Sequence, residues 1–358
     1  MPGPFTDHHV HLLSTAAARL SIDVSAARSV GEMARLVRSG ATPGAGWLRA
    51  WGYEEWALEE GRHPSRFDLD RMAPGRPLVV HHRSGHAAVA NSAALSEMGE
   101  PDHPDGILVD RHDLLSRVPR LDRTALEAAA AAVSAEWEAA GVAAVVDATH
   151  TNGGEQLELL AAWCADGVIR QQVTAMVAPG ELSSVPAYGS SVGAVRVGPA
   201  KLMPAPADLA GLPDQVAAAH TAGFPVAVHV VEIDALDATL RAFGASAAPA
   251  GTVDRIEHNA LCLPEQVAGI AACRAMVVVN PAFLLHRRLK YALQLEAVER
   301  RWLIRIGSLL RAGIPVRAGS DSPVTPSRPD EIVAAATAHP FVPEESVTRE
   351  QAELLLHP

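Results

Sequence analysis

A repeated junction constrains the fold most strongly: a helix-forming run ends on a glycine, and an apolar, β-branched run starts at once. The junction occurs at Gly141, Gly167, Gly223 and Gly313. Glycine just past a helix adopts a left-handed backbone conformation that L-residues resist. The runs that follow, such as VAAVVDATH, are apolar on both faces, as is typical of strands buried in a parallel sheet. The repeat therefore predicts alternating helices and parallel strands.

Eight segments qualify as strands of this sheet. From the second onward they recur every roughly 25 to 40 residues, the length of one strand and one helix. Eight such units predict an α/β protein with a (β/α)8 TIM barrel. An open, doubly wound sheet is the weaker alternative, because no glycine-rich phosphate-binding turn follows the first strand. The strands are predicted to end near His11, Thr149, Val177, Met203, Val231, His258, Asn280 and Asp321.

The spacing is interrupted once, because about 130 residues separate the first two strands. We expect one barrel domain over residues 1–358, in which residues 14–120 form an insertion over the rim where the strands end. Within it, RPLVVHH predicts one further strand. Long excursions at this rim usually build the substrate pocket. Elsewhere, strong helix formers predict helices over 121–140, 155–165 and 296–312.

Composition narrows the classes of function. The chain has 30 basic and 41 acidic residues and a net charge of −11, which argues against binding to nucleic acid or to an anionic membrane. No apolar stretch is long enough to span a bilayer, and no secretory signal is visible. Three cysteines provide neither a disulfide framework nor a zinc-knuckle spacing. We expect a cytoplasmic protein that acts on a small molecule; a homodimer is left open.

Metal-binding residue types occupy the predicted strand ends, which is where barrel enzymes place their chemistry. The first strand ends at His9-Val10-His11, and residues i and i+2 of a strand point the same way. Imidazoles and a carboxylate that converge from several strands suit Zn²⁺ or a similar divalent ion. The fourth, fifth, sixth and eighth strands are predicted to end at Lys201, His229, His258 and Asp321, respectively.

With these residues the sequence resembles the metal-dependent amidohydrolase superfamily, and more narrowly its amidohydrolase-3, or YtcJ-like, branch. The resemblance covers nearly the whole chain. It rests on the ordered strand-end set above together with GWLRAWGY, RSGHAAVANSAAL, GVAAVVDAT, DRIEHN and GSDSPV. Relatives usually carry a β-sandwich built from both ends of the chain. We expect that sandwich to be absent or vestigial here, because the first strand starts within ten residues of Met1.

The resemblance implies a mechanism with one or two metal ions, which we expect to be zinc. His9 and His11 would hold one ion with Asp321, and His229 and His258 the other. Lys201 would be carboxylated by CO₂ to a carbamate that bridges the ions. A metal-activated hydroxide would attack the carbonyl, and Asp321 would carry the proton to the leaving nitrogen. Lys201 is followed by MPAPADL instead of the Asp-Gly common in the branch, so substrate specificity is not carried over.

Two further histidines are candidates for contact with substrate. His86, in RSGHAAVANSAAL, resembles a position where the branch places a substrate-facing histidine. His150, in DATHTN, follows the second strand on the same rim. Both are predicted to bind substrate.

The sequence therefore predicts an enzyme that hydrolyses a non-peptide C–N bond of a small molecule, in an amide, a cyclic amide or a carbamate-like group. Two alternatives stay open. The first is a deaminase with one metal on His9, His11, His229 and Asp321 and an uncarboxylated Lys201. The second is a catalytically silent binding protein on the same barrel, which the complete ligand set disfavours.

Overall fold

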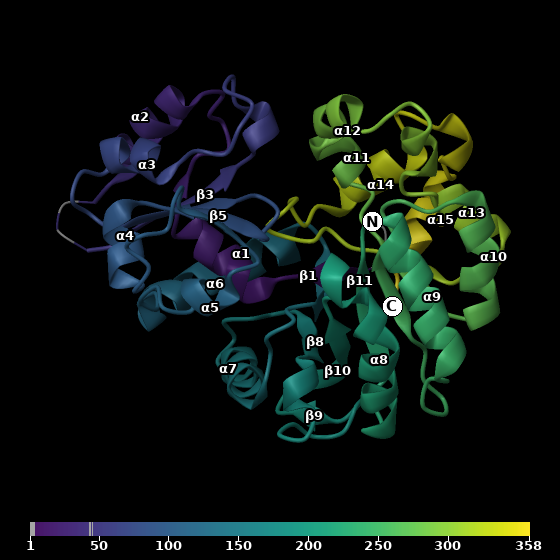
Figure 1. Ribbon diagram of the computed structural model, residues 1–358. Coiled ribbons are helices and arrows are strands. Elements are labelled where there is room, and N and C mark those ends of the chain that lie inside the picture. The colour runs from purple at the N-terminus through teal and green to yellow at the C-terminus, as the bar shows by residue number, and fades with distance from the viewer. Residues whose placement is uncertain (1–3, 43, 45) are drawn as a thin grey trace. The chain divides into compact units, whose positions relative to one another are not determined.

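The computed structural model describes residues 4–42, 44 and 46–358, which belong to two compact units (Figure 1). Unit 1 comprises Met1–Leu12 and Ala131–Pro358, and unit 2 comprises Leu13–Ala130. Helix α6 (Arg123–Ala139) crosses the boundary between them. Unit 2 spans the segment that the sequence marks as an insertion over 14–120. The treatment of the whole chain as one domain stays a prediction.

Unit 1 contains the predicted barrel. Its eight principal strands are all parallel to their neighbours and follow one another around a nearly closed sheet with flanking helices, which confirms the (β/α)8 fold (Figure 1). A short strand, β9 (Ser191–Val192), adds to β10 in antiparallel orientation. In sheet order the eight are β1 (Phe5–Val10), β7 (Val142–Asp147), β8 (Gln172–Val177), β10 (Val195–Leu202), β11 (Val226–Val230), β12 (Arg255–His258), β13 (Met276–Val279) and β14 (Val316–Ala318).

The barrel closes between β1 and the segment that follows β14. Val10 forms a parallel bridge with Ser322. The backbone N–H of His11 donates to the carbonyl of Ser322 at 2.8 Å, and that of Asp321 donates to the carbonyl of His9 at 2.7 Å. The first and last strands of the barrel are thus joined at their carboxyl ends by the residues predicted to bind metal.

The junction glycines have the conformation that the sequence predicts. Gly141, Gly167, Gly223 and Gly313 all have positive φ angles, between 71° and 85°. Each ends a helix shortly before the next strand, which starts at once after Gly141 and five residues later, at Gln172, after Gly167. The other helices of unit 1 are α7 (Gly154–Ala165), α8 (Leu212–Thr221), α9 (Ile233–Ala245), α10 (Pro264–Cys273), α11 (Phe283–His286), α12 (Arg288–Gln294), α13 (Ile306–Arg311), α14 (Pro329–Thr337) and α15 (Arg349–Leu354).

The single helix predicted over 296–312 is wrong. A 3₁₀ turn at Glu299–Trp302 and helix α13 replace it. Between them Leu303 forms a bridge with Leu261, and Ile304 has a φ of 41°, which no helix accommodates. Both side chains are about 1% exposed, so burial of these two residues overrides the helical propensity of the surrounding sequence.

Unit 2 has a mixed five-stranded sheet of its own, where the sequence predicted only one strand. Parallel pairing joins β2 to β3 and β3 to β4, and antiparallel pairing joins β4 to β5 and β5 to β6. The predicted run RPLVVHH contains β4. The elements are α1 (Leu12–Arg19), β2 (Ile22–Asp23), α2 (Val30–Gly40), β3 (Leu48–Tyr53), α3 (Arg66–Met72), β4 (Leu78–His82), β5 (Ala87–Ala90), α4 (Ser92–Glu97), β6 (Ile107–Val109) and α5 (His112–Leu115).

Both faces of this second sheet are covered by apolar side chains. Leu78 and Val80 of β4 pack into a cluster with Met33 and Leu69 of helices α2 and α3. Val79, which points to the opposite face, packs into a separate cluster with residues of α4 and β6. Unit 2 therefore has its own hydrophobic core on each side of the sheet.

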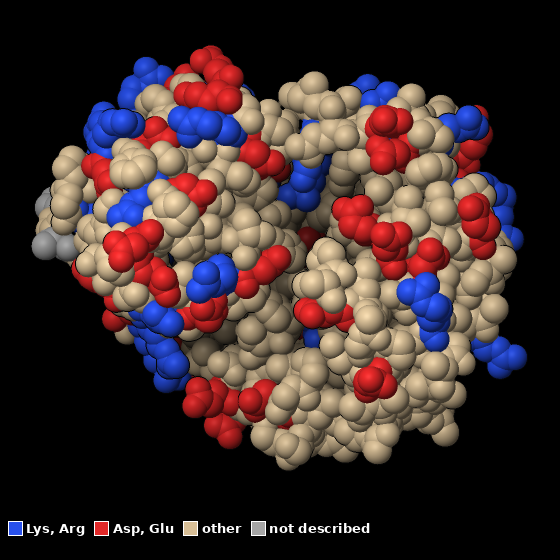
Figure 2. Space-filling model, viewed as in Figure 1, with Lys and Arg blue, Asp and Glu red and all other residues tan. Residues whose placement is uncertain are grey.

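The distribution of charge on the surface and the character of the helices bear on the nucleic-acid and membrane partners that the composition argues against. On the face shown in Figure 2, acidic and basic side chains are interspersed. Among the described residues, no helix combines the length and apolar character that crossing a membrane requires.

Gly319 provides a test of barrel closure. A Cβ atom at this position would lie 2.5 Å from the backbone nitrogen of His9 and 2.6 Å from its Cβ. We expect Gly319→Ala to lower the free energy of unfolding by about 1–3 kcal/mol, because β1 must move away. Chemical denaturation measures this change.

The matched control is Gly244→Ala in α9, where an added Cβ meets no atom within 4 Å. This change should stabilise the protein by up to about 1 kcal/mol through helix propensity. Equal effects of the two substitutions would contradict the proposed close approach of β1 and Gly319.

Candidate metal centre

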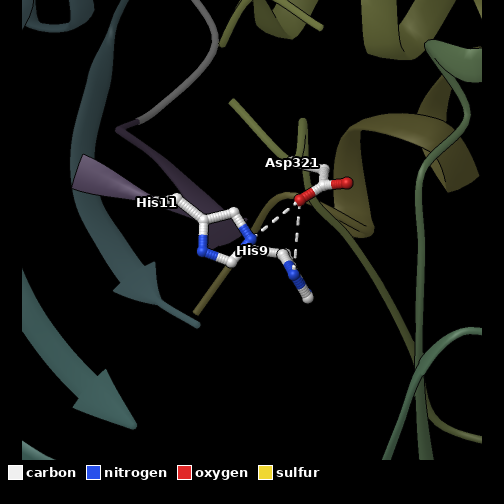
Figure 3. Close-up of side chains that lie close together, drawn as sticks. All are labelled: His9, His11 and Asp321. Carbon is white, nitrogen blue, oxygen red and sulfur yellow. Dashed lines mark ion pairs between the residues drawn. The ribbon is translucent and has the colours of Figure 1, made fainter. Parts of the chain in front are cut away.

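Three predicted ligands meet at one point at the carboxyl end of the barrel. His9 is the last residue but one of β1, His11 follows this strand, and Asp321 follows β14. Their ligand atoms all lie within 4.8 Å of one another, an arrangement that could hold a metal ion. Oδ1 of Asp321 is 3.5 Å from Nε2 of His9 and 3.1 Å from Nε2 of His11, as the dashed lines in Figure 3 show.

The other three predicted ligands lie on strands of the same barrel. Lys201 is on β10, His229 on β11, and His258 is the last residue of β12. The His258 ring lies between two imidazoles, with its centroid 4.6 Å from those of both His9 and His229. Lys201 is 1% exposed, and its Nζ has no hydrogen-bond partner. Among the described residues, the group whose donor atoms converge closely enough to hold an ion consists of His9, His11 and Asp321, and the role of the other three as ligands stays a prediction.

Hydrogen bonds fix the tautomers of two of the imidazoles. Nδ1 of His9 lies 2.6 Å from Oε2 of Glu257, and a carboxylate can only accept, so Nδ1 carries the proton. Nδ1 of His258 lies 2.7 Å from Oδ1 of Asn280, whose amide is oriented by donation from Nδ2 to the carbonyl of Gly319. In both histidines Nε2 is left with a free lone pair, as metal ligation requires.

His11 is held in a different way. Its Nδ1 lies 3.2 Å from Oγ1 of Thr149, a hydroxyl that can donate or accept. The hydroxyl would therefore accept Nδ1–H if Nε2 bound a cation. In the absence of a cation it allows the other tautomer, in which Nε2–H donates to Asp321.

Burial keeps the two inner imidazoles neutral. Burial and the neighbouring Lys201 ammonium lower the pKa of His9 to about 4. Burial and the nearby His9 lower the pKa of His258 to about 3. Both rings are neutral at neutral pH, the form in which an imidazole nitrogen binds a metal.

The pKa values of Asp321 and Lys201 are both lowered, which favours the charged form of the carboxyl group and the neutral form of the amine. Burial alone would raise the pKa of Asp321, but the hydrogen bond from His11 and the nearby His9 and His258 together outweigh it and hold this pKa below its usual value. Burial lowers the pKa of the Lys201 amine to about 8, although Glu257 and Asp321 oppose the shift. The site therefore offers an ionised carboxylate and an amine that loses its proton easily.

The loops at the strand ends hold the site residues in unusual backbone conformations. His258 and Asp321 have positive φ angles of 69° and 60°, which non-glycine residues adopt rarely and mostly at functional sites. The loop after β14 is anchored by Asp7, whose Oδ1 accepts the backbone N–H of Ser320 at 2.9 Å. Oδ2 of Asp7 accepts the hydroxyl of Ser327 at 2.5 Å.

The two predicted substrate contacts lie in different units. His150 follows β7 in unit 1, is half-buried, and is adjacent to Thr149. His86 lies in unit 2, where its Nδ1 is 3.0 Å from Oδ1 of Asp110. Contact of either histidine with substrate stays a prediction.

Sequence reasoning missed the residues that support the ligands. Glu257, Thr149, Asn280 and Asp7 bind the imidazoles or the loop that carries Asp321. The sequence contained a signal for two of them, since Glu257 lies in DRIEHN and Asp7 lies two residues before His9. Only the three-dimensional structure pairs Glu257 with His9, which is 248 residues away.

The residues present fit a divalent cation. Two buried nitrogens, Nε2 of His9 and Nζ of Lys201, have no hydrogen-bond partner within the protein. Burial without a partner is costly for a polar group, and such atoms call for a ligand. Neutral imidazoles beside an ionised carboxylate are the donors that Zn²⁺ and similar ions prefer.

Comparison with known proteins identifies the family. A profile of the Amidohydrolase family matches residues 1–352, and the chain therefore belongs to this family. It is 26% identical over 423 aligned positions to the N-substituted formamide deformylase of Arthrobacter pascens, covering 98% of this chain and 77% of that protein. It is 33% identical over 114 residues to YtcJ of Bacillus subtilis (strain 168), covering 30% of this chain and 21% of that protein.

A solved structure has the same fold over nearly the whole chain. A metal-dependent hydrolase from Pyrococcus furiosus superposes with a TM-score of 0.73 at 23% identity, covering 99% of this chain and 80% of that one. The predicted resemblance to the YtcJ-like amidohydrolases is thus confirmed, and membership of this family makes the chain a hydrolase.

The ligand group can be tested by metal content. We expect His11→Ala and Asp321→Asn each to weaken binding of a divalent ion by at least about tenfold, because each removes one of three converging donors. The number of metal ions per chain after dialysis, measured by elemental mass spectrometry, reports the loss.

The matched control is His103→Ala. The His103 side chain lies in unit 2, where its Nδ1 accepts the backbone N–H of Gly106, and it should not affect metal content. Retention of the full metal complement by both site variants would rule out this ligand group.

Proposed function

We propose that the protein hydrolyses the C–N bond of an N-substituted formamide or a closely related N-acyl amine. The observation that carries this proposal is the convergence of His9, His11 and Asp321 at the mouth of an amidohydrolase barrel. The narrower choice of substrate is supported by identity to an N-substituted formamide deformylase along 98% of the chain.

The divalent ion, which we propose to be zinc, would when bound make a water molecule more acidic and polarise the substrate carbonyl. His9 and His11 would hold this ion through Nε2, which needs neutral rings such as the low pKa of His9 provides. Asp321 is ionised, lies within 3.5 Å of Nε2 of both histidines, and faces the same point.

Asp321 also has the properties of a proton carrier. A carboxylate held at the reaction centre accepts a proton as the nucleophilic water attacks, and returns it to the leaving nitrogen as the C–N bond breaks. The products are then formate, or another carboxylate, and a free amine. The backbone bond from Asp321 to the carbonyl of His9 at 2.7 Å holds the loop of this residue against β1 during both transfers.

Carboxylation of Lys201 would add a negative charge to the site. CO₂ reacts with a neutral amine to give a carbamate and a proton, and a pKa of about 8 makes the neutral amine accessible near physiological pH. The reaction would replace the Lys201 ammonium, a buried cation whose Nζ has no hydrogen-bond partner, with an anion. We propose that this carbamate, together with His229 and His258, would help to hold a second ion.

Activity provides the first test. Full-length protein should release formate from N-alkyl or N-aryl formamides, lose this activity on chelation, and regain it with added Zn²⁺. Asp321→Asn should lower kcat by about 10²–10⁴-fold through loss of the proton carrier.

Two outcomes would contradict this proposal. Full hydrolysis after complete removal of metal would exclude a metal-dependent reaction. Release of ammonia from an amino-substituted ring, with no cleavage of any formamide or N-acyl amine, would favour the deaminase alternative.

The carbamate has a direct spectroscopic test. The chain contains only two lysines, Lys201 and Lys290. Protein equilibrated with ¹³C-bicarbonate should give one carbamate carbon signal in NMR, which Lys201→Met removes and Lys290→Met retains. Absence of the signal in metal-loaded, active protein would exclude the carbamate and leave metal-dependent hydrolysis possible.

A further inference from the structure

The DRIEHN motif places two charged side chains inside the barrel that the proposed reaction does not use. Arg255 and Glu257 are separated by one residue on β12, so their side chains share a face of the strand. The Glu257 side chain is completely buried, and that of Arg255 is 12% exposed. Buried charges at this depth need an explanation, because unpaired charges are strongly disfavoured in a protein interior.

Glu257 is joined to a proposed metal ligand across the barrel. Its Oε2 accepts the Nδ1–H of His9 at 2.6 Å, and both side chains are completely inaccessible to solvent. Strands β12 and β1 are not neighbours in the sheet, so the two side chains meet across the barrel interior. Hydrogen bonds to ionised acceptors at this distance are strong and directional.

Arg255 holds the same carboxylate mainly through its other oxygen, with a longer bond of 3.3 Å from Nη2 to Oε2. Its Nε donates to Oε1 of Glu257 at 2.7 Å, and its Nη2 donates to the carbonyl of His8 at 2.9 Å. The guanidinium therefore links β12 to β1 immediately beside His9. It also fixes the rotation of the carboxylate, so that Oε2 is directed at the imidazole.

We propose that Arg255 and Glu257 are positioning residues that fix His9 as its Nδ1–H tautomer and thereby set the affinity of the site for a divalent ion. This inference rests on the proposed function, in which Nε2 of His9 binds that ion. Neither side chain is proposed to touch the substrate.

The two carboxylate oxygens make Glu257→Gln a sharp test. In this variant Arg255 still requires an acceptor, so the amide oxygen turns toward the guanidinium and the amide NH₂ faces His9. The imidazole must then accept at Nδ1 and carry its proton on Nε2, where it blocks the metal. Affinity for Zn²⁺, measured on metal-free protein by competition with a chromophoric chelator, should fall by about 10–100-fold.

The tautomer itself gives a readout independent of metal and of activity. In metal-free protein labelled with ¹⁵N-histidine, the His9 signals are those lost in His9→Ala. They should show a protonated Nδ1 in the wild type and a protonated Nε2 in Glu257→Gln.

A second variant separates positioning from mere packing. In Arg255→Met/Glu257→Gln the amide is free to turn its oxygen to His9, so part of the Zn²⁺ affinity should return relative to Glu257→Gln alone. A purely structural role predicts a further loss instead. If Glu257→Gln does not fold, Glu257→Asp keeps the charge for Arg255 and withdraws the carboxylate from His9, and the same fall in affinity is expected.

The control is another buried glutamate paired with arginine. Glu345 accepts from Arg305 at 3.1 Å and from the backbone N–H of Ser308 at 2.7 Å, and neither residue is a proposed ligand. Glu345→Gln should lower the thermal midpoint and leave Zn²⁺ affinity unchanged.

The outcomes distinguish the two proposals. If the wild type binds Zn²⁺ and hydrolyses formamides while folded Glu257→Gln binds as tightly with an unchanged His9 tautomer, the positioning role is overturned and the proposed function stands. If the wild type binds no divalent ion, both are overturned. If Glu257→Gln and Glu345→Gln lower the affinity for Zn²⁺ equally, the role of Glu257 is structural and the positioning role is overturned.

Discussion

Closure of the barrel between β1 and the loop after β14 is the constraint on which the site depends. The backbone bonds that join His9 to Asp321 and His11 to Ser322 bring together residues from opposite ends of the sequence. Gly319 allows this approach because a side chain there would overlap His9. Asp7 anchors the same loop through Ser320 and Ser327. The site is thus a property of the closed barrel and not of any single loop.

Much of the fold was predictable from local sequence patterns. Glycines such as Gly141 and Gly313 mark where helices end, and a strand buried on both faces is recognised by its continuous apolar run. The predicted strand ends differ most from the structure at the eighth strand, which ends at Ala318 instead of Asp321. Because parallel strands of a barrel end at one rim, knowing these ends was enough to predict that His9, His11 and Asp321 meet.

What could not be predicted depends on contacts between residues far apart in sequence. The pairing of Glu257 with His9, and of Asn280 with His258 and Gly319, follows from the geometry of the barrel interior. The sheet of unit 2 was missed for a related reason: β2, β5 and β6 have two to four residues each, and strands so short carry little periodicity. Burial of Leu303 overrode a helix that propensity favoured.

The order in which these residues are synthesised has a consequence for how the protein is made. His9 and His11 are synthesised before their partner Asp321, which follows only after all the barrel strands. Until the last strand is made, the chain lacks the carboxylate of the three-residue group that could hold an ion. Under the proposed function, an ion would therefore be loaded only after the barrel closes, and the proportion of active molecules would depend on the supply of that ion.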